Sequence, residues 1–560
     1  MPRMTGAQII IKLLERQGIT WLPGIPGGSN LPLYDALSQS RILRHVLARH
    51  EQGAGFMAQG MARATGRVAA CLATSGPGAT NLITAVADAK ADSVPLVVIT
   101  GQVSQALMGT DAFQEVDTFG MSAPVTKHSF LVRSAQELLS ALPRAFSIAA
   151  SGRPGPVWVD VPKDVQQAEV EVGCWPEPGA AAGLPELDEE ALRACARLIN
   201  QAERPLLYVG GGAASPAAAA QVRALAEGLG LPVASTLMGL GAFPAGHALS
   251  LGLFGMHGAP CANLGLEEAD LLIVLGARFD DRATGALNRF CPRAQVVHID
   301  IDASELGKLR RPHAELAADV AQALAALIPL LGRRPRPQWQ AQVQRLKQEH
   351  PLELAGSQGL GSAYGLIAAC AKVLPGARVA TDVGQHQMWV AQAWPHRHPR
   401  CWLTSGGLGT MGFGLPAALG AALACPGEPV LCFSGDGSLM MNLQEMATAA
   451  EAGISVKLVL MDNQSLGLVG QQQDLFYGGR RFACDYSRGP SWAPLARALG
   501  WQAWDLAEES DPEAALQSAL LCPGPALLRC PLPREAQVLP MVPPGAANTE
   551  MIRPPRRQAA

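Results

Sequence analysis

The sequence is short of the features that mark several large classes of protein. Lys and Arg together number 44 and Asp and Glu 47, so the net charge is only -3 over 560 residues. Such a chain lacks the basic surface that binding to nucleic acid requires. Charged residues make up 16% and hydrophobic residues 48%, a composition that excludes an intrinsically disordered protein. We therefore expect a folded protein that does not bind nucleic acid.

Metal-binding cysteine pairs and targeting segments are also missing. The 12 cysteines form no CxxC or CxxH pair, so neither a zinc site nor a disulfide framework is expected. The first residues, MPRMTGAQIIIKLLERQGI, do not resemble a signal peptide. Residues 401–427 carry no Asp, Glu, Lys or Arg and could span a bilayer. Their glycine-rich stretch SGGLGTMGFGLP favours a buried loop before a helix instead, so we expect a soluble, cytoplasmic protein without a membrane segment.

The sequence does contain short apolar runs that alternate with segments of helix length. Such runs are typical of parallel sheets covered on both faces, and they predict an α/β fold. At about 150 residues per domain, the length suggests three or four domains. Linkers rich in Pro and Gly predict three doubly wound parallel-sheet domains at 1–170, 185–335 and 360–535, and a tail at 536–560. The apolar runs lie at 68–74, 95–100, 156–162, 206–210, 271–276, 296–302, 429–434 and 456–461.

The first and third of these domains contain a similar pattern of predicted elements, called here the internal echo. Residues 68–102 are predicted to form a strand, an SGPG turn, a helix and a second strand, and residues 429–463 repeat this order around SGDG. Glycine at a strand-to-helix turn is common in any doubly wound sheet, so the echo by itself leaves a shared function open. The second copy differs in one informative way, because it has Asp436 where the first has Pro77.

The GDGS turn that contains Asp436 predicts a site for phosphate and metal. Free glycine N–H groups at the start of a helix form a cradle for phosphate. Asp436 and Asn463 follow successive strands, so their oxygens can converge on a Mg²⁺ ion. The pattern resembles the diphosphate–metal motif of thiamine-diphosphate enzymes, which implies that Asp436, Asn463 and the carbonyl of Ser465 bind the metal. That family usually has asparagine at the position of Asp462.

A second constellation, ARHEQGAG at 48–55, contains Glu51. On its own, Glu51 is typical of a solvated residue at the start of a helix. The resemblance implies a catalytic role, because in this family a glutamate hydrogen-bonds N1′ of the aminopyrimidine and favours the imino form that takes the proton from C2. Since Glu51 and the GDGS motif lie on different domains, the resemblance also implies that two subunits meet at each active site.

Longer stretches identify the family more closely. From Thr5 to Met551 the chain resembles the catalytic large subunits of acetolactate synthases (acetohydroxyacid synthases), of the bacterial isozyme I type. The resemblance implies a transferase that uses thiamine diphosphate, Mg²⁺ and FAD. It would decarboxylate pyruvate and join the two-carbon unit to pyruvate or 2-ketobutyrate, the first common step of branched-chain amino-acid biosynthesis. It also implies a homodimer or homotetramer with a separate small regulatory subunit. The matching stretches include GIPGGSNLPLYDAL, GTDAFQEVD, SGRPGPVWVDVPKDVQ, LGARFDDR and TDVGQHQMW.

The same resemblance implies roles around the substrate and the thiamine ring. Gly409 would offer its carbonyl to N4′ and Met411 would support the bent cofactor. Gln472 stands where many relatives have a tryptophan that packs on the ethyl group of 2-ketobutyrate. Simpler interpretations stay open, with Met411 in the core and Gln472 in solvent. Arg278 would receive the second keto acid's carboxylate. Gly28, Phe113, Gln114 and Lys163 would line the substrate entrance (Lys163 could instead be a surface partner of Asp164), and Val383, Gln385, His386, Gly437, Ser438 and Val469 would contact thiamine diphosphate.

The middle domain, together with Arg153 of the first domain, holds the residues that imply FAD. The glycines at 210–212 are a weak dinucleotide signal, because no GxGxxG follows. Without a flavin they would be ordinary turns. In the family this flavin performs no net redox chemistry in the main reaction. The implied contacts are Arg153, Gly211, Gly212, Thr236, Leu237, Met256, His257, Gly276, Ala277, Arg278, Asp280, Asp300, Ile301 and Asp319.

Three other functions remain open from the sequence. A flavin-using pyruvate oxidase would share the three-domain plan but consume an electron acceptor. Glyoxylate carboligases are related but lack the glutamate found here as Glu51. A non-catalytic binding protein on the same fold would have no need to keep Glu51, Asp436, Asn463 and Arg278 together.

Overall fold

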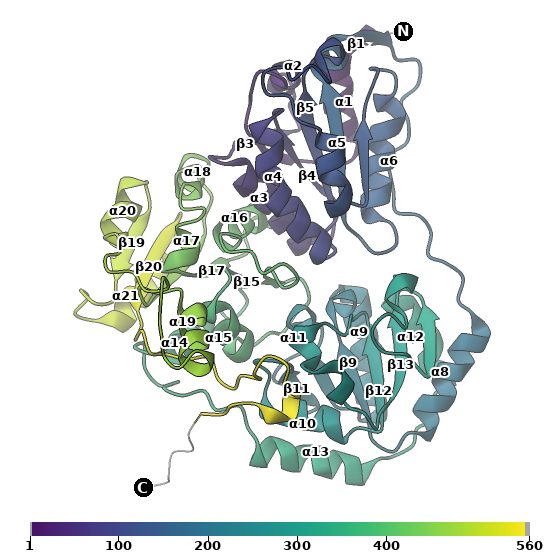
Figure 1. Ribbon diagram of the computed structural model, residues 1–560, viewed down its shortest axis with the longest axis vertical. Coiled ribbons are helices and arrows are strands. Elements are labelled where there is room, and N and C mark those ends of the chain that lie inside the picture. The colour runs from purple at the N-terminus through teal and green to yellow at the C-terminus, as the bar shows by residue number, and fades with distance from the viewer. Residues whose placement is uncertain (1–2, 555–560) are drawn as a thin grey trace.

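The computed structural model describes residues 3–554 and contains three six-stranded parallel sheets with helices on their faces (Figure 1). The predicted α/β fold is confirmed. β1 (Arg3–Thr5) and β8 (Glu169–Glu171) form a separate two-stranded antiparallel sheet, which pairs the start of the chain with the segment that follows the first large sheet. The first large sheet has the order β3-β2-β4-β5-β7-β6, the middle one β11-β10-β9-β12-β13-β14 and the third β16-β15-β17-β18-β20-β19.

The first and third sheets have the same topology. Numbered within each sheet, the strands of both follow the order 2-1-3-4-6-5. The first comprises β2 (Trp21–Gly24), β3 (Arg44–Leu47), β4 (Ala69–Ala73), β5 (Leu96–Gln102), β6 (His128–Leu131) and β7 (Pro156–Pro162). The third comprises β15 (Arg378–Thr381), β16 (Trp402–Leu403), β17 (Val430–Gly435), β18 (Lys457–Asp462), β19 (Gln502–Asp505) and β20 (Ala526–Pro531).

Helices cover both faces of these two sheets. Every residue of β4, β5, β17 and β18 is consequently buried, which explains their continuous apolar sequences. The first unit has α1 (Gly6–Arg16), α2 (Leu31–Ser38), α3 (Glu51–Thr65), α4 (Pro77–Ala91), α5 (Thr118–Ser122), α6 (Leu138–Ala150) and α7 (Lys163–Gln167). The third has α14 (Ala363–Val373), α15 (Gln385–Ala393), α16 (Gly414–Ala424), α17 (Asp436–Leu439), α18 (Glu445–Glu451), α19 (Gly467–Phe476), α20 (Trp492–Ala498) and α21 (Pro512–Leu521).

The middle sheet reverses its winding between β9 and β12, where crevices for ligands form in doubly wound sheets. Its strands are β9 (Pro205–Val209), β10 (Val233–Ser235), β11 (Ser250–Leu253), β12 (Leu271–Leu275), β13 (Gln295–Asp300) and β14 (Ala314–Ala317). Its helices are α8 (Glu189–Gln201), α9 (Pro216–Leu229), α10 (Pro260–Glu268), α11 (Asp281–Thr284), α12 (Val320–Leu327) and α13 (Pro337–Glu349).

The uncharged segment 401–427 forms β16, a glycine-rich loop and the buried helix α16. Within residues 3–554, no helix is long and apolar enough to cross a membrane. The internal echo holds for the strands but fails for one helix. The single helix predicted after GDGS is wrong, because the chain breaks between α17 and α18. At this break the Asn442 side chain donates to the carbonyl of Gly412 at 2.7 Å, which holds the chain against the glycine-rich loop.

The first and third units are joined by helices α3 and α16, which lie side by side (Figure 1). Their backbones approach so closely that only glycine fits at two positions. A Cβ on Gly60 would overlap the carbonyl oxygen of Ala417, and one on Gly420 would overlap the carbonyl oxygen of Met57. The pairing of the two units therefore depends on these two glycines.

Replacing Gly60 with alanine should destabilise the protein, because α3 and α16 would have to move apart. Overpacking of this kind costs about 1–3 kcal/mol. The matched control is Gly228→Ala in α9, where a Cβ meets no atom within 4 Å; better helix propensity should stabilise that variant by about 0.5–1 kcal/mol. Thermal unfolding of the two variants would contradict this account if both shifted in the same direction.

Candidate active site

A cavity of about 180 Å³ opens at the carboxyl edge of the third sheet. Asp436 begins α17 directly after β17, and Asn463 directly follows β18, so the parallel strands bring both side chains to this edge. The predicted metal ligands and thiamine contacts line the cavity together. They are Asp436, Asn463, Ser465, Val383, Gln385, His386, Gly409, Met411, Gly437, Ser438 and Val469.

The electrostatics of this cavity fit a bound cation. Burial, together with the nearby charge of Asp462, raises the pKa of Asp436 to about 7, and its Oδ1 atom has no hydrogen-bond partner. The Asn463 amide nitrogen donates to Gln385 Oε1 at 3.1 Å, which leaves the amide oxygen available. A carboxylate and an amide oxygen are hard ligands of the kind that Mg²⁺ prefers. A divalent ion would compensate the buried charge that the protein alone leaves unpaired.

Asp462, at the position where the family usually has asparagine, does not compete for this site. Its Oδ2 atom accepts a hydrogen bond from Arg529 Nε at 2.7 Å, and Arg529 also contacts Asp505 at 2.8 Å. Its Oδ1 atom accepts from the backbone N–H of Gln464 at 3.2 Å. The extra negative charge is therefore paired on the sheet side of the cavity.

The loop that carries Gly409 and Met411 is held by Asp382, the residue that follows β15. Its carboxylate accepts the N–H groups of Gly412 and Gly414 at 2.8 and 3.2 Å. Burial raises the pKa of Asp382 to about 6. Gly409 and Gly412 have φ angles of 71° and 88°, which glycine adopts without strain. The loop conformation at the cavity thus depends on one buried carboxylate and two glycines.

Glu51 and the predicted substrate residues lie at the carboxyl edge of the first sheet instead. Glu51 is buried as the first residue of α3 and accepts a hydrogen bond from Asn81 Nδ2 at 2.9 Å. A Cβ on Gly76 would lie 2.8 Å from the carbonyl oxygen of Gln114, so the loop of Gln114 packs on the SGPG turn. Of the described residues at this edge, Gly28, Glu51, Phe113, Gln114 and Lys163 do not line the cavity at the third sheet. One chain therefore presents two separate groups of residues.

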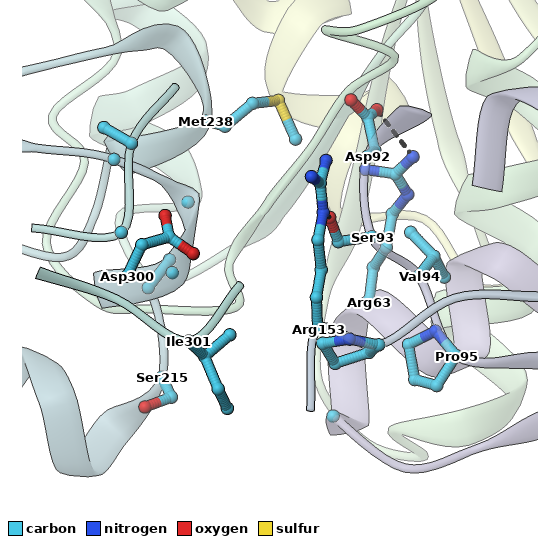
Figure 2. Close-up of a pocket in the computed structure, with 18 of the residues that line it drawn as sticks. Arg63, Asp92, Ser93, Val94, Pro95, Arg153, Ser215, Met238, Asp300 and Ile301 are labelled. Atoms are coloured by element: carbon cyan, nitrogen blue, oxygen red, sulfur yellow. Dashed lines mark hydrogen bonds and ion pairs between the residues drawn. The ribbon is translucent and has the colours of Figure 1, made fainter. Parts of the chain in front are cut away.

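A larger cavity of about 470 Å³ lies between the first and middle units (Figure 2). It opens at the carboxyl ends of β9, β12 and β13, close to the start of α9. Glycine turns at 210–212 and at Gly276 pack so tightly that a Cβ on Gly212 would lie 2.8 Å from Gly276 Cα. A volume of this size, bounded by glycine turns and a helix N-terminus, suits a dinucleotide. The predicted residues that line it are Arg153, Gly211, Gly212, Thr236, Gly276, Ala277, Arg278, Asp280, Asp300, Ile301 and Asp319.

Three sequence families match the chain in order. They are described as the N-terminal TPP binding domain (residues 4–121), the central domain (192–327) and the C-terminal TPP binding domain (382–530) of thiamine pyrophosphate enzymes. The acetolactate synthase isozyme 1 large subunit of Escherichia coli K12 is 57% identical over 98% of this chain and 98% of its own length. The isozyme 2 large subunit of the same organism is 46% identical, over 98% and 99%. The acetolactate synthase large subunit of Parasynechococcus marenigrum is 46% identical, over 98% and 91%.

The chain belongs to the acetolactate synthase large-subunit family. The predicted family is therefore confirmed, and with it a thiamine-diphosphate-dependent acetolactate synthase. These full-length relatives favour that activity over the alternatives of a pyruvate oxidase, a glyoxylate carboligase or a non-catalytic binding protein. The roles of individual residues stay predictions.

Some predicted residues lie elsewhere. Leu237, Met256 and His257 do not line the larger cavity, although they were expected to contact FAD. The last two face the C-terminal segment: His257 Nδ1 lies 3.0 Å from the carbonyl oxygen of Pro540, and the N–H of Val542 donates to the carbonyl of Met256. Arg278, expected at the second keto acid, lines the larger cavity and not the smaller one.

The wall that the first unit contributes to the larger cavity was not foreseen apart from Arg153. The N-terminal edge of β5 and the ends of two helices supply it, and these carry no recognised motif. The available signal was weak: Arg63 and Asp92 lie in alanine-rich segments, and the segment of Asp92 also contains Asp88 and Lys90. The unforeseen residues include Arg63, Asp92, Ser93, Val94 and Pro95, opposite Met238 of the middle unit (Figure 2).

Proposed function

We propose that this chain, with thiamine diphosphate, Mg²⁺ and FAD bound, decarboxylates pyruvate and transfers the two-carbon unit to pyruvate or 2-ketobutyrate. Thiamine diphosphate, when bound, supplies the nucleophilic C2 atom and the electron sink that lets CO₂ leave. The observation that carries the proposal is the cavity at the third sheet. Asp436, in the GDGS turn, lines this cavity together with Asn463, and one of its carboxylate oxygens has no hydrogen-bond partner.

Asp436, Asn463 and the carbonyl of Ser465 would hold Mg²⁺, and the turn with Gly437 and Ser438 would receive the diphosphate. The Asp436 carboxylate would then remain ionised at neutral pH, because the metal compensates the burial that now raises its pKa. Gly409 and Met411, on the loop held by Asp382, would orient the aminopyrimidine.

Glu51 would act from a second copy of this chain, in a homodimer or homotetramer. The proposal is supported by the absence of Glu51 from the lining of the cavity that contains Asp436. It is also supported by exposed apolar side chains near both groups: Phe113 is 88% exposed, and Met440 and Met441, directly after α17, are about half exposed. Large apolar side chains left in solvent are typical of a surface that another subunit covers.

FAD would occupy the larger cavity, with its phosphates near the glycine turns of the middle sheet. Arg278 borders this cavity, and we propose that its guanidinium receives the carboxylate of the acceptor keto acid at the edge of the flavin. Orientation of the acceptor is chiefly an entropic contribution to rate. The matches to named large subunits support a separate small regulatory subunit. The family matches fall inside the domains that we propose at 1–170, 185–335 and 360–535.

The proposed function is tested by incubating the purified chain with pyruvate, thiamine diphosphate, Mg²⁺ and FAD. We expect acetolactate and CO₂ to form without uptake of oxygen. Oxygen consumption in proportion to pyruvate would instead indicate an oxidase. Absence of acetolactate from protein that binds all three cofactors would overturn the proposal.

Replacing Glu51 with glutamine should preserve the fold and cofactor binding but slow exchange of the C2 proton of thiamine diphosphate by about 100-fold or more, the usual scale of general acid–base catalysis. An amide cannot play the carboxyl's part in the proton transfer at N1′. NMR of the acid-quenched cofactor after incubation in D₂O measures the exchange. The control is Glu186→Gln, an exposed carboxylate in the segment before the middle unit. Exchange at the wild-type rate in Glu51→Gln would refute the assigned role.

Gln472 predicts weak discrimination between pyruvate and 2-ketobutyrate as acceptor. It is exposed on α19, one turn after Val469, which lines the cavity. An apolar pocket gains ~1–3 kcal/mol per methylene, so Gln472→Trp should raise the ratio of acetohydroxybutyrate to acetolactate about tenfold. Competition between equal concentrations of both keto acids measures the ratio. Gln472→Ala, which adds no indole, should leave it near the wild-type value, and an unchanged ratio in the tryptophan variant would contradict the prediction.

A further inference from the structure

The loop 404–413, between β16 and α16, touches all three units of the protein. Gly409 and Met411 line the smaller cavity. Gly406 lies against Met238 of the middle unit so closely that a Cβ would overlap the Met238 sulfur. Met238 in turn lines the larger cavity. A displacement of this loop would therefore change the walls of both cavities.

Two carboxylates at the end of α4 hold the loop to the first unit. Asp92 Oδ2 accepts the N–H of Gly406 at 3.0 Å, and Asp92 Oδ1 accepts the N–H of Gly407 at 2.7 Å. Asp88 Oδ2 accepts the hydroxyl of Thr410 at 2.9 Å and also that of Ser405. The backbone of the loop is thus fixed on both sides of residue 408.

Arg63, from the last turn of α3, compensates these two buried charges. Its Nη2 atom lies 2.8 Å from Asp92 Oδ2 and 3.2 Å from Asp88 Oδ1, and its Nη1 atom donates to the carbonyl of Thr404 at 3.0 Å. The guanidinium also lies over the ring of Phe413, 5.0 Å from its centroid. Less than a tenth of each charged side chain is exposed. Removal of one partner from such a cluster leaves an unpaired buried charge.

The same ion pair forms part of the wall of the larger cavity. Figure 2 shows Asp92 and Arg63 joined on the first-unit side, with Met238 on the side of the middle unit. A ligand in this cavity would pack on both walls at once. The loop is therefore attached at Gly406 and Gly407 to Asp92, which lines the larger cavity. Thr410 is attached to Asp88, which reaches the cavity wall only through its ion pair with Arg63.

The other end of the loop is fixed independently. Asp382 holds Gly412 and Gly414 to the third sheet. Between the two attachments, Gly409 borders the smaller cavity, and a Cβ there would meet no atom within 4 Å. The segment that can respond to a change at Asp92 is consequently the one that faces the smaller cavity.

We infer that Arg63, Asp88 and Asp92 are positioning residues that couple the two cofactor cavities, so that a dinucleotide in the larger cavity strengthens thiamine diphosphate binding in the smaller one. The bound dinucleotide fixes Arg63, Asp92 and Met238, and these fix the loop in the form that presents Gly409 and Met411. The inference rests on the proposed function, which assigns FAD and thiamine diphosphate to these cavities. Thermodynamic reciprocity requires thiamine diphosphate to strengthen FAD binding by the same factor.

The experiment measures binding of each cofactor with and without the other, in the presence of Mg²⁺. Near-UV circular dichroism follows thiamine diphosphate and flavin fluorescence follows FAD. In the wild type, each cofactor should lower the Kd of the other by the same factor, about 5–150-fold. Asp92→Asn should bring this factor close to one, because asparagine has one acceptor oxygen for two glycine N–H groups. Thr410→Val removes a hydroxyl but no charge, and should lower the factor several-fold even if the Asp92 variant does not fold.

Asp319→Asn is the matched control. Asp319 lines the larger cavity from the middle unit, where it accepts the N–H of Gln322 at the start of α12. Its replacement should weaken FAD binding but leave the coupling factor unchanged. Independent binding of both cofactors to the wild type, or an equal loss of coupling in Asp319→Asn, would overturn the inference while leaving the proposed function intact. Failure of the wild type to bind either cofactor would instead overturn the proposed function and the inference with it.

Discussion

The close contact of α3 with α16 is the constraint on which the rest of the structure depends. At Gly60 and Gly420 the two helices approach to a distance that only glycine permits. Helix α3 begins with Glu51 and carries Arg63 in its last turn, while α16 follows directly on the loop 404–413. The position of one helix pair thus sets where Glu51 stands, where Arg63 compensates two buried carboxylates, and where the loop of Gly409 leaves the third sheet.

Three aspartates at the edge of the third sheet have different roles because their hydrogen-bond and ion-pair partners differ. Asp382 accepts hydrogen bonds from three backbone N–H groups and thereby holds the loop 404–413 in place. Asp462 forms an ion pair with Arg529. Asp436 alone of these three keeps a buried carboxylate oxygen without a partner. A buried charge of that kind costs free energy unless it is paired, and a cation at the proposed metal site would pair it.

The sequence predicted the central strands well because burial on both faces leaves a continuous apolar run, as in β4, β5, β17 and β18. Edge strands such as β16, two residues long, and β3, with two exposed residues, carry no such signal. At the sites, the motif residues next to strand ends line the cavity at the third sheet, because the ends of parallel strands share one edge. Met256 and His257 contact the C-terminal segment near Pro540, almost 300 residues away in sequence, which no local pattern predicts; their contact with FAD stays a prediction. Arg63 and Asp92 were missed because a tertiary contact, and not a local pattern, brings them to the larger cavity.

The shared strand order of the first and third sheets explains why the predicted residues form two groups. In each sheet the predicted functional residues follow the carboxyl ends of the strands, so they gather at one edge of each unit. Within one chain, α3 and α16 fill the space between the two units, and the pairing of the units is already fixed by that packing. The packing of α3 on α16 keeps the edge with Glu51 apart from the edge with Asp436 within one chain. This separation is the reason for proposing that Glu51 acts at the Asp436 cavity of a second copy.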